Sequence, residues 1–504
     1  ASILGDTPMQ SILTNLSIGL QTAFTFNNIL WVFIGGTLGT IIGMLPGLGP
    51  ATGVAILIPI TFGMNPATAL ITMAAVYYGA MFGGSRASIM LNIPGDASAI
   101  VSCFDGYPMT KKGKAGTALA ISAIASFIGG TIGMIFLIFL SQPVASAALK
   151  FGPAEMFSLM AFALVATITL SEGNLLKGLF SIVVGLMLST IGIDPLAGVV
   201  RFTYGVSSLN EGIDFLVIII GVYAVTEVYK NLKSIDRVYE FDSKSIGKVK
   251  VSKEEFKQCI VPMLRSTPLG FIIGVLPGMG GTIATFMSYA MEKNLSKHPE
   301  EFGKGTIEGL AAPEAANNAC SCGAMVPLLT LGIPGSGTTA VMLGALMLLG
   351  VRPGPTLFTD HPEIAWGVIA SMLIGNIILL IINLPLAIPL VQLLRVPQRI
   401  MLPIVMGLGL IGAYFLNYSS FDLILVMVSA LVGYIFVILE VPLPPLVLAL
   451  ILGGTTEQSF RNAMVLSDGN PAIFFQKPIS AVFIVLAGVS LVYALVKRRR
   501  QVAK

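Results

Sequence analysis

Two ionisable side chains stand where the flanking residues are small or apolar. Arg86 follows Gly83-Gly84-Ser85, and Glu314 lies in Ala311-Ala-Pro-Glu-Ala-Ala-Asn317-Asn318. Charges at membrane depth are costly and usually functional. A guanidinium fork suits a carboxylate ligand, whereas a carboxylate among amide oxygens suits a cation or a proton. The alternatives are that Arg86 snorkels or pairs with Asp96, and that Glu314 is a loop carboxylate just outside the membrane.

Small polar residues surround two Ile-Pro-Gly motifs, at Pro94 and Pro334, which are 240 positions apart (334 − 94 = 240). Amide and hydroxyl groups there can donate hydrogen bonds to a carboxylate without adding charge. The alternative for each hydroxyl is a hydrogen bond to a carbonyl of its own helix. The predicted substrate-binding residues are Gly47, Gly49, Ser85, Arg86, Asn92, Pro94, Gly95, Ser321, Pro334, Gly335, Ser336, Thr338 and Thr339.

A second duplicated motif is Leu-Pro-Gly-X-Gly, with Pro46 and Pro277 separated by 231 positions (277 − 46 = 231). A helix broken there exposes N–H groups that attract anions and carbonyl groups that attract cations. The alternative is a tight turn between packed helices. The predicted Na⁺-binding residues are Pro46, Gly47, Gly278, Gly280, Thr282, Glu314, Asn317 and Asn318.

The composition indicates a membrane protein, since 55% of residues are hydrophobic, 11% are charged and the mean hydropathy is +0.88. A soluble domain is nearer a quarter charged. We therefore predict an all-α polytopic membrane protein with about 11–12 transmembrane helices. The stretches 85–100 and 325–340 are too short and too rich in Gly and Pro to span, and they fit re-entrant hairpins. Two histidines and four cysteines give no metal or haem pattern, so no cofactor is expected. The net charge of +4 mostly reflects cytoplasmic loops, so no nucleic-acid partner is expected.

The duplicated motifs predict two homologous repeats, 1–229 and 258–504, joined by a linker at 230–257 whose excess of Lys and Arg places it in the cytoplasm. Basic loops correspond to neutral loops in the other half, which favours inverted repeats. Parallel repeats remain an alternative because the last helix, 479–496, matches 214–229. Strict inversion would then place the basic tail Lys497–Arg500 outside the cell.

The motifs resemble those of the large membrane subunit of the tripartite tricarboxylate transporter family over essentially the whole chain. The matching runs are Gly43–Pro50, Tyr78–Ser85, Leu91–Gly95, Asp105–Pro108, Ala312–Asn318, Leu331–Gly335 and Gly350–Pro355. The resemblance implies import of di- and tricarboxylates, such as citrate-like acids, across the bacterial inner membrane. It implies coupling to a cation gradient, usually Na⁺, and two partners: a small four-helix membrane subunit and a periplasmic substrate-binding protein. Arg86 departs from the small or polar residue expected after Gly-Gly-Ser.

The duplicated hairpins and broken helices predict one compact unit that carries substrate past a stiffer scaffold in an elevator-like movement, with rocking as the alternative. A channel built on the same re-entrant loops is a rival, and so is an intramembrane enzyme. The sequence contains neither His-Glu-X-X-His nor Gly-X-Ser-X-Gly, so we do not expect an enzyme.

Overall fold

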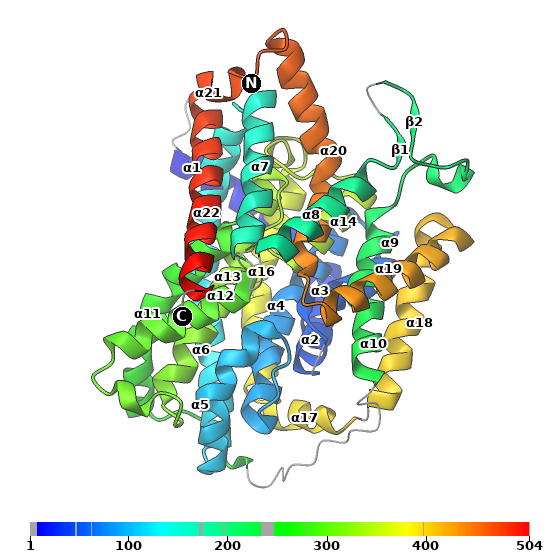
Figure 1. Ribbon diagram of the computed structural model, residues 1–504. Coiled ribbons are helices and arrows are strands. Elements are labelled where there is room, and N and C mark those ends of the chain that lie inside the picture. Colours follow the sequence, from blue (N-terminus) through cyan, green and yellow to red (C-terminus); the bar gives the residue numbers. More distant parts are fainter. Residues whose placement is uncertain are drawn as a thin grey trace.

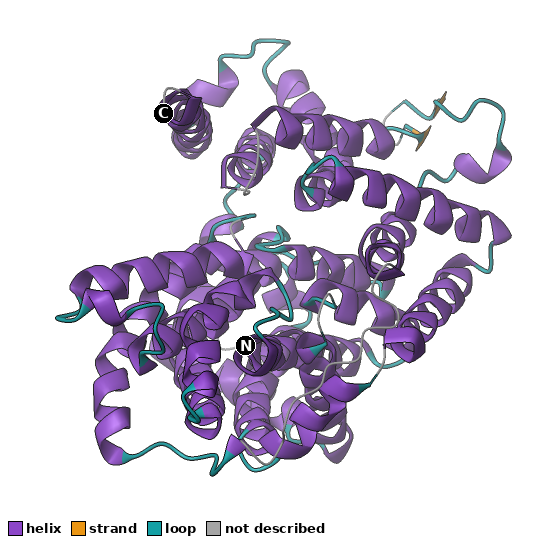
Figure 2. Cartoon of the chain, turned by 60° about the horizontal axis from the view of Figure 1, so that its bottom comes forward, coloured by secondary structure: helices purple, strands orange, loops and turns teal. Residues whose placement is uncertain are grey.

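The computed structural model describes residues 8–45, 48–61, 63–170, 175–194, 197–232, 246–278, 280–396 and 398–502. This part of the chain is mostly helical (Figure 1). One short antiparallel pair, β1 (Gly192–Ile193) with β2 (Val200–Arg201), aligns Gly192 with Arg201. It lies at the periphery of the molecule (Figure 2). In Figure 1 it is at the upper right, away from α5 and α17 at the bottom.

The helices account for most of the described residues. In chain order they are α1 (Pro8–Ala23), α2 (Phe26–Met44), α3 (Pro50–Thr61), α4 (Pro66–Leu91), η1 (Ala97–Ala99), α5 (Ile100–Lys111), α6 (Ala115–Ala148), α7 (Pro153–Leu170), α8 (Leu175–Ser189), η2 (Ser207–Leu209), α9 (Phe215–Ile219), the π-helical turn η3 (Ile220–Val225), α10 (Thr226–Asn231), α11 (Lys253–Val275), α12 (Gly280–Leu295), η6 (Pro299–Glu301), α13 (Ile307–Leu331), α14 (Gly337–Leu348), α15 (Leu357–Asp360), α16 (Pro362–Asn383), α17 (Ala387–Gln392), η7 (Leu393–Arg395), α18 (Gln398–Asn417), α19 (Ser420–Ile438), α20 (Leu443–Leu466), α21 (Ile473–Gln476) and α22 (Pro478–Val502).

Several helices are long and apolar enough to cross a membrane. In the described part of the chain, six helices of at least 18 residues meet this criterion: α2, α4, α6, α11, α16 and α19. Six shorter apolar helices or helix segments accompany them. The structure confirms the helical fold, and its long apolar helices are consistent with a multi-pass membrane protein. The predicted total of 11–12 spans and the re-entrant hairpins stay predictions.

The first half is centred on α4, whose residues from Ala67 to Met90 are all buried. Helix α2 packs closely on it because Gly39 and Gly43 carry no side chain. A Cβ at Gly39 would overlap the Val76 carbonyl, and one at Gly43 would overlap the Ala80 carbonyl. Backbone contact of this kind is typical of helix pairs in membranes.

The second half is centred on α13, which is buried from Ile307 to Thr330 except at Glu308. Here α11 makes the close approach through Gly270 and Gly274, where a Cβ would overlap carbonyl groups of α13. The first-half helix α6 also packs on α13. The two halves therefore share one buried centre.

The polypeptide turns sharply where α4 and α13 end. Asn92 caps α4 in the left-handed region (φ 57°), and Gly332 caps α13 in the same region (φ 68°). A proline follows two residues later in each case, which prevents the helix from continuing. Residues 85–91 therefore belong to α4, so the non-helical part of the predicted segment 85–100 is limited to the turn before η1.

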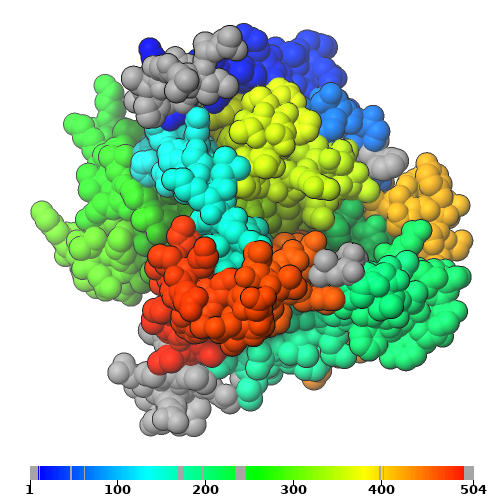
Figure 3. All heavy atoms as spheres, turned by 90° about the horizontal axis from the view of Figure 1, so that it is seen from above, coloured from blue at the N-terminus to red at the C-terminus, as the bar shows by residue number. Residues whose placement is uncertain are grey.

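Helices from opposite ends of the sequence meet at one side of the molecule. Helix α8 contacts α20, and α7 contacts both α20 and α22. The view from above shows the green segment near residue 200 beside the orange C-terminal helices (Figure 3). Segments of the two predicted repeats, 1–229 and 258–504, therefore pack against each other on this side.

Three basic segments gather at one end of the molecule. Lys112 Nζ, after α5, donates to the Lys304 carbonyl oxygen at 2.6 Å. Gly116, at the start of α6, lies against the backbone of Ile246 and Lys248 from the 230–257 segment. The three segments therefore lie on the same side of any membrane that the chain spans.

Candidate functional site

A pocket of about 600 Å³ forms where the duplicated motifs meet. Its walls come from the residues after α2, the turn after α4, the start of α12 and the start of α14, with contributions from α4, the π-helical turn, α10, α19 and the start of α20. Among the predicted site residues, Gly49, Pro94, Gly95, Gly280, Thr282, Ser336 and Thr338 line it. Segments that are far apart in the sequence thus face one cavity.

The N-terminus of α14 opens onto this pocket. Ser336 is the N-cap: its hydroxyl accepts a hydrogen bond from Thr339 N–H at 3.2 Å, and the Thr339 hydroxyl accepts one from Ser336 N–H at 2.8 Å. Tyr77 of α4 places its hydroxyl 3.3 Å from Ser336 Oγ. The free N–H groups and the dipole of a helix start favour an anion at this wall.

Tyr223 brings a further hydroxyl to the same wall. The hydroxyl is buried and has no hydrogen-bond partner within the described residues. It lies 2.9 Å from the point that a Cβ on Gly337 would occupy. Tyr223 belongs to the π-helical turn, and such turns occur often at functional sites.

The turn after α4 brings Asp96 to the same pocket. The Ser98 hydroxyl donates to both Asp96 carboxylate oxygens, at 3.0 and 2.9 Å, and Ala99 N–H donates to Oδ1 at 3.2 Å. Glu227 also lines the pocket, but it is paired with Lys230 at 2.7 Å. Of the two carboxylates that line the pocket, Asp96 is therefore the one without a basic partner among the described residues.

Several predicted binding residues are not among the described residues that line the pocket, and Ser85, Ser321 and Asn92 belong to this group. Ser85 shares a hydrogen bond with Ser122 Oγ at 2.8 Å, and Ser321 donates to the Asn318 carbonyl at 2.7 Å. Asn92 is exposed and serves as the C-cap of α4. Ser321 therefore follows the alternative expectation, in which the hydroxyl bonds to a carbonyl of its own helix.

Arg86 is fully buried in α4, and it is not among the described residues that line the pocket. Its guanidinium donates to the carbonyl of Phe82 and, at 3.0 Å, to that of Asn383 on α16. It therefore neither snorkels nor pairs with Asp96 within the described chain. Its role in substrate binding stays a prediction.

Glu314 lies in the middle of α13 and is buried, so it is not an exposed loop carboxylate. Its oxygens accept hydrogen bonds from three serines: Ser102 of α5, and Ser122 (3.1 Å) and Ser126 (3.3 Å) of α6. These bonds join three helices around one carboxylate. The predicted part of Glu314 in cation coupling stays a prediction.

Asn317 and Asn318, the next predicted cation ligands on α13, are also buried. Asn318 Nδ2 donates to the Glu314 carbonyl at 3.2 Å. The Oδ1 atoms of both asparagines have no hydrogen-bond partner in the described structure. A buried carbonyl oxygen of this kind calls for an explanation such as an ion or a water.

The remaining predicted residues hold the turns together. Gly278 N–H donates to the Gly335 carbonyl at 3.1 Å, which ties the break after α11 to the turn after α13. Pro334 and Thr339 are buried beside the pocket. Pro46 and Gly47 lie outside the described residues.

Sequence reasoning missed several polar residues that line the pocket, among them Tyr77, Asp96, Ser98 and Tyr223. Asp96 stands directly after Pro94-Gly95, so the motif itself could have indicated it. The hydroxyls of Tyr77 and Tyr223 lie within apolar helices, and their direction depends on how those helices pack. No local sequence signal marks them.

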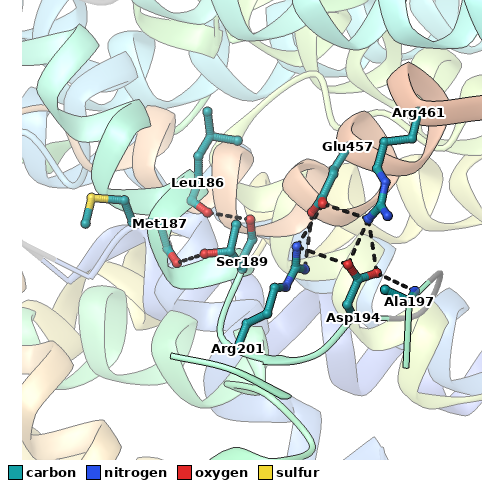
Figure 4. Close-up of polar contacts among 9 residues, drawn as sticks. Leu186, Met187, Ser189, Asp194, Ala197, Arg201, Glu457 and Arg461 are labelled. Atoms are coloured by element: carbon teal, nitrogen blue, oxygen red, sulfur yellow. Dashed lines mark hydrogen bonds and ion pairs between the residues drawn. The ribbon is translucent and has the colours of Figure 1, made fainter. Parts of the chain in front are cut away.

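A second charged cluster lies outside this pocket, beside β1 and β2 (Figure 4). Arg201 contacts Glu457 at 2.8 Å and Asp194 at 3.6 Å, and Arg461 contacts Asp194 at 2.8 Å and Glu457 at 3.2 Å. The hydrogen bonds that Arg201 donates to the Glu457 carboxylate raise the pKa of Arg201 above its usual range. The cluster ties the β1–β2 pair to α20, and each charge in it is paired.

Known proteins resemble this chain along most of its length. An Agrobacterium vitis protein described as "Uncharacterized 52.8 kDa protein in TAR-I ttuC' 3'region" is 44% identical over 488 residues, covering 97% of each chain. A second A. vitis protein, "Uncharacterized protein in TAR-II ttuC' 3'region", is 44% identical over 226 residues, which is 45% of this chain and 93% of that protein. No solved structure matches the chain.

Residues 29–448 match the family described as "Tripartite tricarboxylate transporter TctA family". This match includes every residue described as lining the pocket, as well as the two duplicated motifs. It agrees with the resemblance seen in the motifs and assigns the chain to transporters rather than enzymes. The chain belongs to the tripartite tricarboxylate transporter TctA family.

Proposed function

We propose that this protein is the membrane subunit that imports di- and tricarboxylates, such as citrate-like acids, across the bacterial inner membrane. A periplasmic binding protein would deliver the substrate, and a small four-helix membrane subunit would complete the transporter. Family membership supports these partners and this class of substrate. A Na⁺ gradient would supply the energy.

The observation that carries the proposal is the pocket at the start of α14. Its volume of about 600 Å³ is within the usual range for small-molecule sites. Ser336, Thr338 and the α14 backbone present neutral donors to it. Such donors suit a carboxylate that must later be released, because they bind it without a strong fixed charge.

We also propose that the two halves are homologous repeats. The contacts of Gly43 with Ala80 and of Gly274 with Cys320 occupy positions related by the offsets 231 and 240 of the motifs. The turns agree as well: Ile93 N–H bonds to Ala87, and Ile333 N–H, 240 positions later, bonds to Pro327. Matched contacts at matched offsets support duplication.

The basic segments support the proposed orientation. Lys111–Lys114, the end of the 230–257 linker and the loop with Lys304 lie together, as an excess of Lys and Arg on the cytoplasmic side requires. Lys304 belongs to a loop whose first-half counterpart, 62–65, is uncharged. This asymmetry favours inverted repeats, with the 352–363 loop in the periplasm.

An elevator-like movement fits the distribution of pocket residues. The turns and broken helices that form the pocket all pack on α4 and α13, so they can move as one unit with the bound ligand. Helices α7, α8, α20 and α22 form a group at one side and could serve as part of the scaffold. Rocking of the two halves is the alternative.

Uptake of radiolabelled citrate and other di- and tricarboxylates tests this function, in cells that also make both partner proteins. Wild type should show saturable, Na⁺-dependent uptake that collapses when K⁺ replaces Na⁺ at a fixed membrane potential. Thr338→Val should weaken apparent affinity roughly ten- to a hundredfold, because a hydrogen bond to a charged ligand contributes about 1.5–3 kcal/mol.

The matched control is Thr456→Val on α20, whose hydroxyl bonds to its own helix at Leu452. It should transport like wild type. Equal affinities for both variants would place the substrate elsewhere. Flux that does not saturate would indicate a channel, and uptake that follows only the pH gradient would replace Na⁺ by H⁺.

A further inference from the structure

Asp96 places a negative charge beside the space that an anionic substrate would occupy. The described residues that line the pocket include one basic side chain, Lys230, and it is paired with Glu227. The contacts of Asp96 are the Ser98 hydroxyl and the Ala99 N–H, both neutral. Asp96 would therefore repel a carboxylate unless a third component neutralises it.

Asn317 supplies an unsatisfied oxygen near Ser98, the residue whose hydroxyl donates to Asp96. The residue is only 4% exposed, and its Oδ1 has no donor in the described chain. Oδ1 lies 2.6 Å from the point that a Cβ on Gly281 would occupy, and Ser98 Cβ lies 3.0 Å from the same point. Gly281 and Ser98 both line the pocket, so Asn317 points at the wall that holds Asp96.

The three side chains together offer ligands for a small, hard cation. A carboxylate, a hydroxyl with free lone pairs and an amide oxygen are the ligand types that such cations prefer. Divalent cations usually recruit several carboxylates. The described residues hold no group of three or more His, Cys, Asp or Glu side chains that could bind a metal, so a singly charged cation fits better.

We propose that Asp96, Ser98 and Asn317 bind the coupling cation, while the start of α14 with Ser336 and Thr338 binds the substrate carboxylate in the same pocket. This inference rests on the proposed function and assigns its two ligands to two different groups of residues. It adds Asp96 and Ser98 to the cation site and leaves Glu314, with its three serine donors, as a group that joins helices.

The arrangement gives coupling a direct electrostatic cause. Without the cation, Asp96 opposes the substrate; with a singly charged cation bound, the net charge of the site is zero and that repulsion is removed. Each ligand therefore raises the affinity for the other by the same factor. Substrate affinity should rise with Na⁺ concentration, and Na⁺ affinity should rise when a carboxylate is present.

Binding of ²²Na⁺ to the purified full-length protein in lipid nanodiscs tests the cation site without substrate or partner proteins. Wild type should bind Na⁺ in preference to K⁺. Asp96→Asn and Asn317→Leu should each weaken Na⁺ binding about tenfold or more, because each removes a ligand and the first also removes the charge. Asp96→Glu keeps the charge and should retain part of the affinity.

The matched control is Asp422→Asn on α19. Asp422 is also a buried carboxylate, 7% exposed, and it accepts a hydrogen bond from Asn417 at 2.8 Å, far from this group of ligands. Its variant should bind Na⁺ like wild type. Size-exclusion profiles select folded protein for every variant, so a loss of binding cannot come from misfolding.

The outcomes separate this inference from the function on which it rests. Unchanged Na⁺ binding in both Asp96→Asn and Asn317→Leu would overturn the site but leave carboxylate import intact. Wild type that binds no Na⁺, yet takes up carboxylates, would also overturn it. Absence of carboxylate uptake in wild type would overturn the proposed function itself, whatever the Na⁺ result.

Discussion

The turn after α4 and the turn after α13 share one backbone design but carry different chemistry. Each has a left-handed cap, Asn92 or Gly332, followed by Pro-Gly. Each then has a side chain that accepts a hydrogen bond from the N–H three residues later. That side chain is the carboxylate of Asp96 in the first turn and the hydroxyl of Ser336 in the second. A single difference in charge can therefore decide which ligand each turn attracts.

The largest expected effect comes from making the second turn resemble the first. Ser336→Asp keeps a good N-cap, so α14 should still form. Its charge would face the substrate, and like charges at about 4 Å repel by about 4 kcal/mol near a protein surface. Carboxylate affinity should fall on the order of a hundredfold or more, as measured by uptake at varied substrate concentration.

The neutral variant Ser336→Asn controls for the size of the new side chain. It should cap the helix equally well and lose far less affinity than Ser336→Asp. Equal losses in the two variants would mean that charge does not distinguish the turns.

The second comparison concerns packing beneath the turns. A Cβ at Gly95 would overlap the Gly43 carbonyl and lie 2.9 Å from Gly84 Cα, whereas one at Gly335 would lie 2.7 Å from the Gly274 carbonyl. Gly95→Ala and Gly335→Ala should both lower stability, by about 1–3 kcal/mol. Gly95→Ala should lower the thermal unfolding midpoint in detergent further.

Gly454→Ala on α20 is the matched control, since nothing lies within 4 Å of the added methyl group. It should leave the midpoint unchanged or raise it slightly, because alanine favours helix. A larger loss for Gly335→Ala than for Gly95→Ala would contradict the difference in packing.

A smaller effect is expected at the two caps. Gly332→Ala should cost about 1–2 kcal/mol, because alanine is strained in the left-handed region and its methyl group would lie 2.9 Å from the Pro353 carbonyl. Asn92→Ala should cost less, since Asn92 is exposed. Thermal unfolding measures both, and Asn92→Gly should stay within a few tenths of a kcal/mol of wild type.

The smallest effect tests the side chains that face each turn. Tyr77 contacts Ser336 at 3.3 Å, and Asn317 is the residue 240 positions later. Tyr77→Phe should weaken carboxylate affinity only about twofold, for a loss of about 0.5 kcal/mol. It should leave ²²Na⁺ binding unchanged, whereas Asn317→Leu should mainly weaken Na⁺ binding. The reverse pattern would show that the two groups of residues have been assigned to the wrong ligands.

Local chemistry in the sequence was sufficient to place the breaks. Asn92 and Gly332 each precede Ile-Pro-Gly, so a left-handed cap and a proline end the helix whatever surrounds it. The same holds for the membrane class, because apolar stretches of this length have no other stable environment. The spacing of the motifs likewise indicated which segments correspond between the halves.

Tertiary packing alone decided which polar residues reach the pocket. Arg86 and Glu314 are the most conspicuous charges in the sequence, yet they bond to Asn383 and to serines of α5 and α6, inside the packed centre. Tyr223, within an apolar helix, faces the pocket instead. The partners that satisfy a buried polar group come from helices far away in the sequence, as with Ser102 and Glu314, which are 212 residues apart. Local sequence therefore specifies where the chain turns, and the packing of distant helices decides which side chains are left free to bind a ligand.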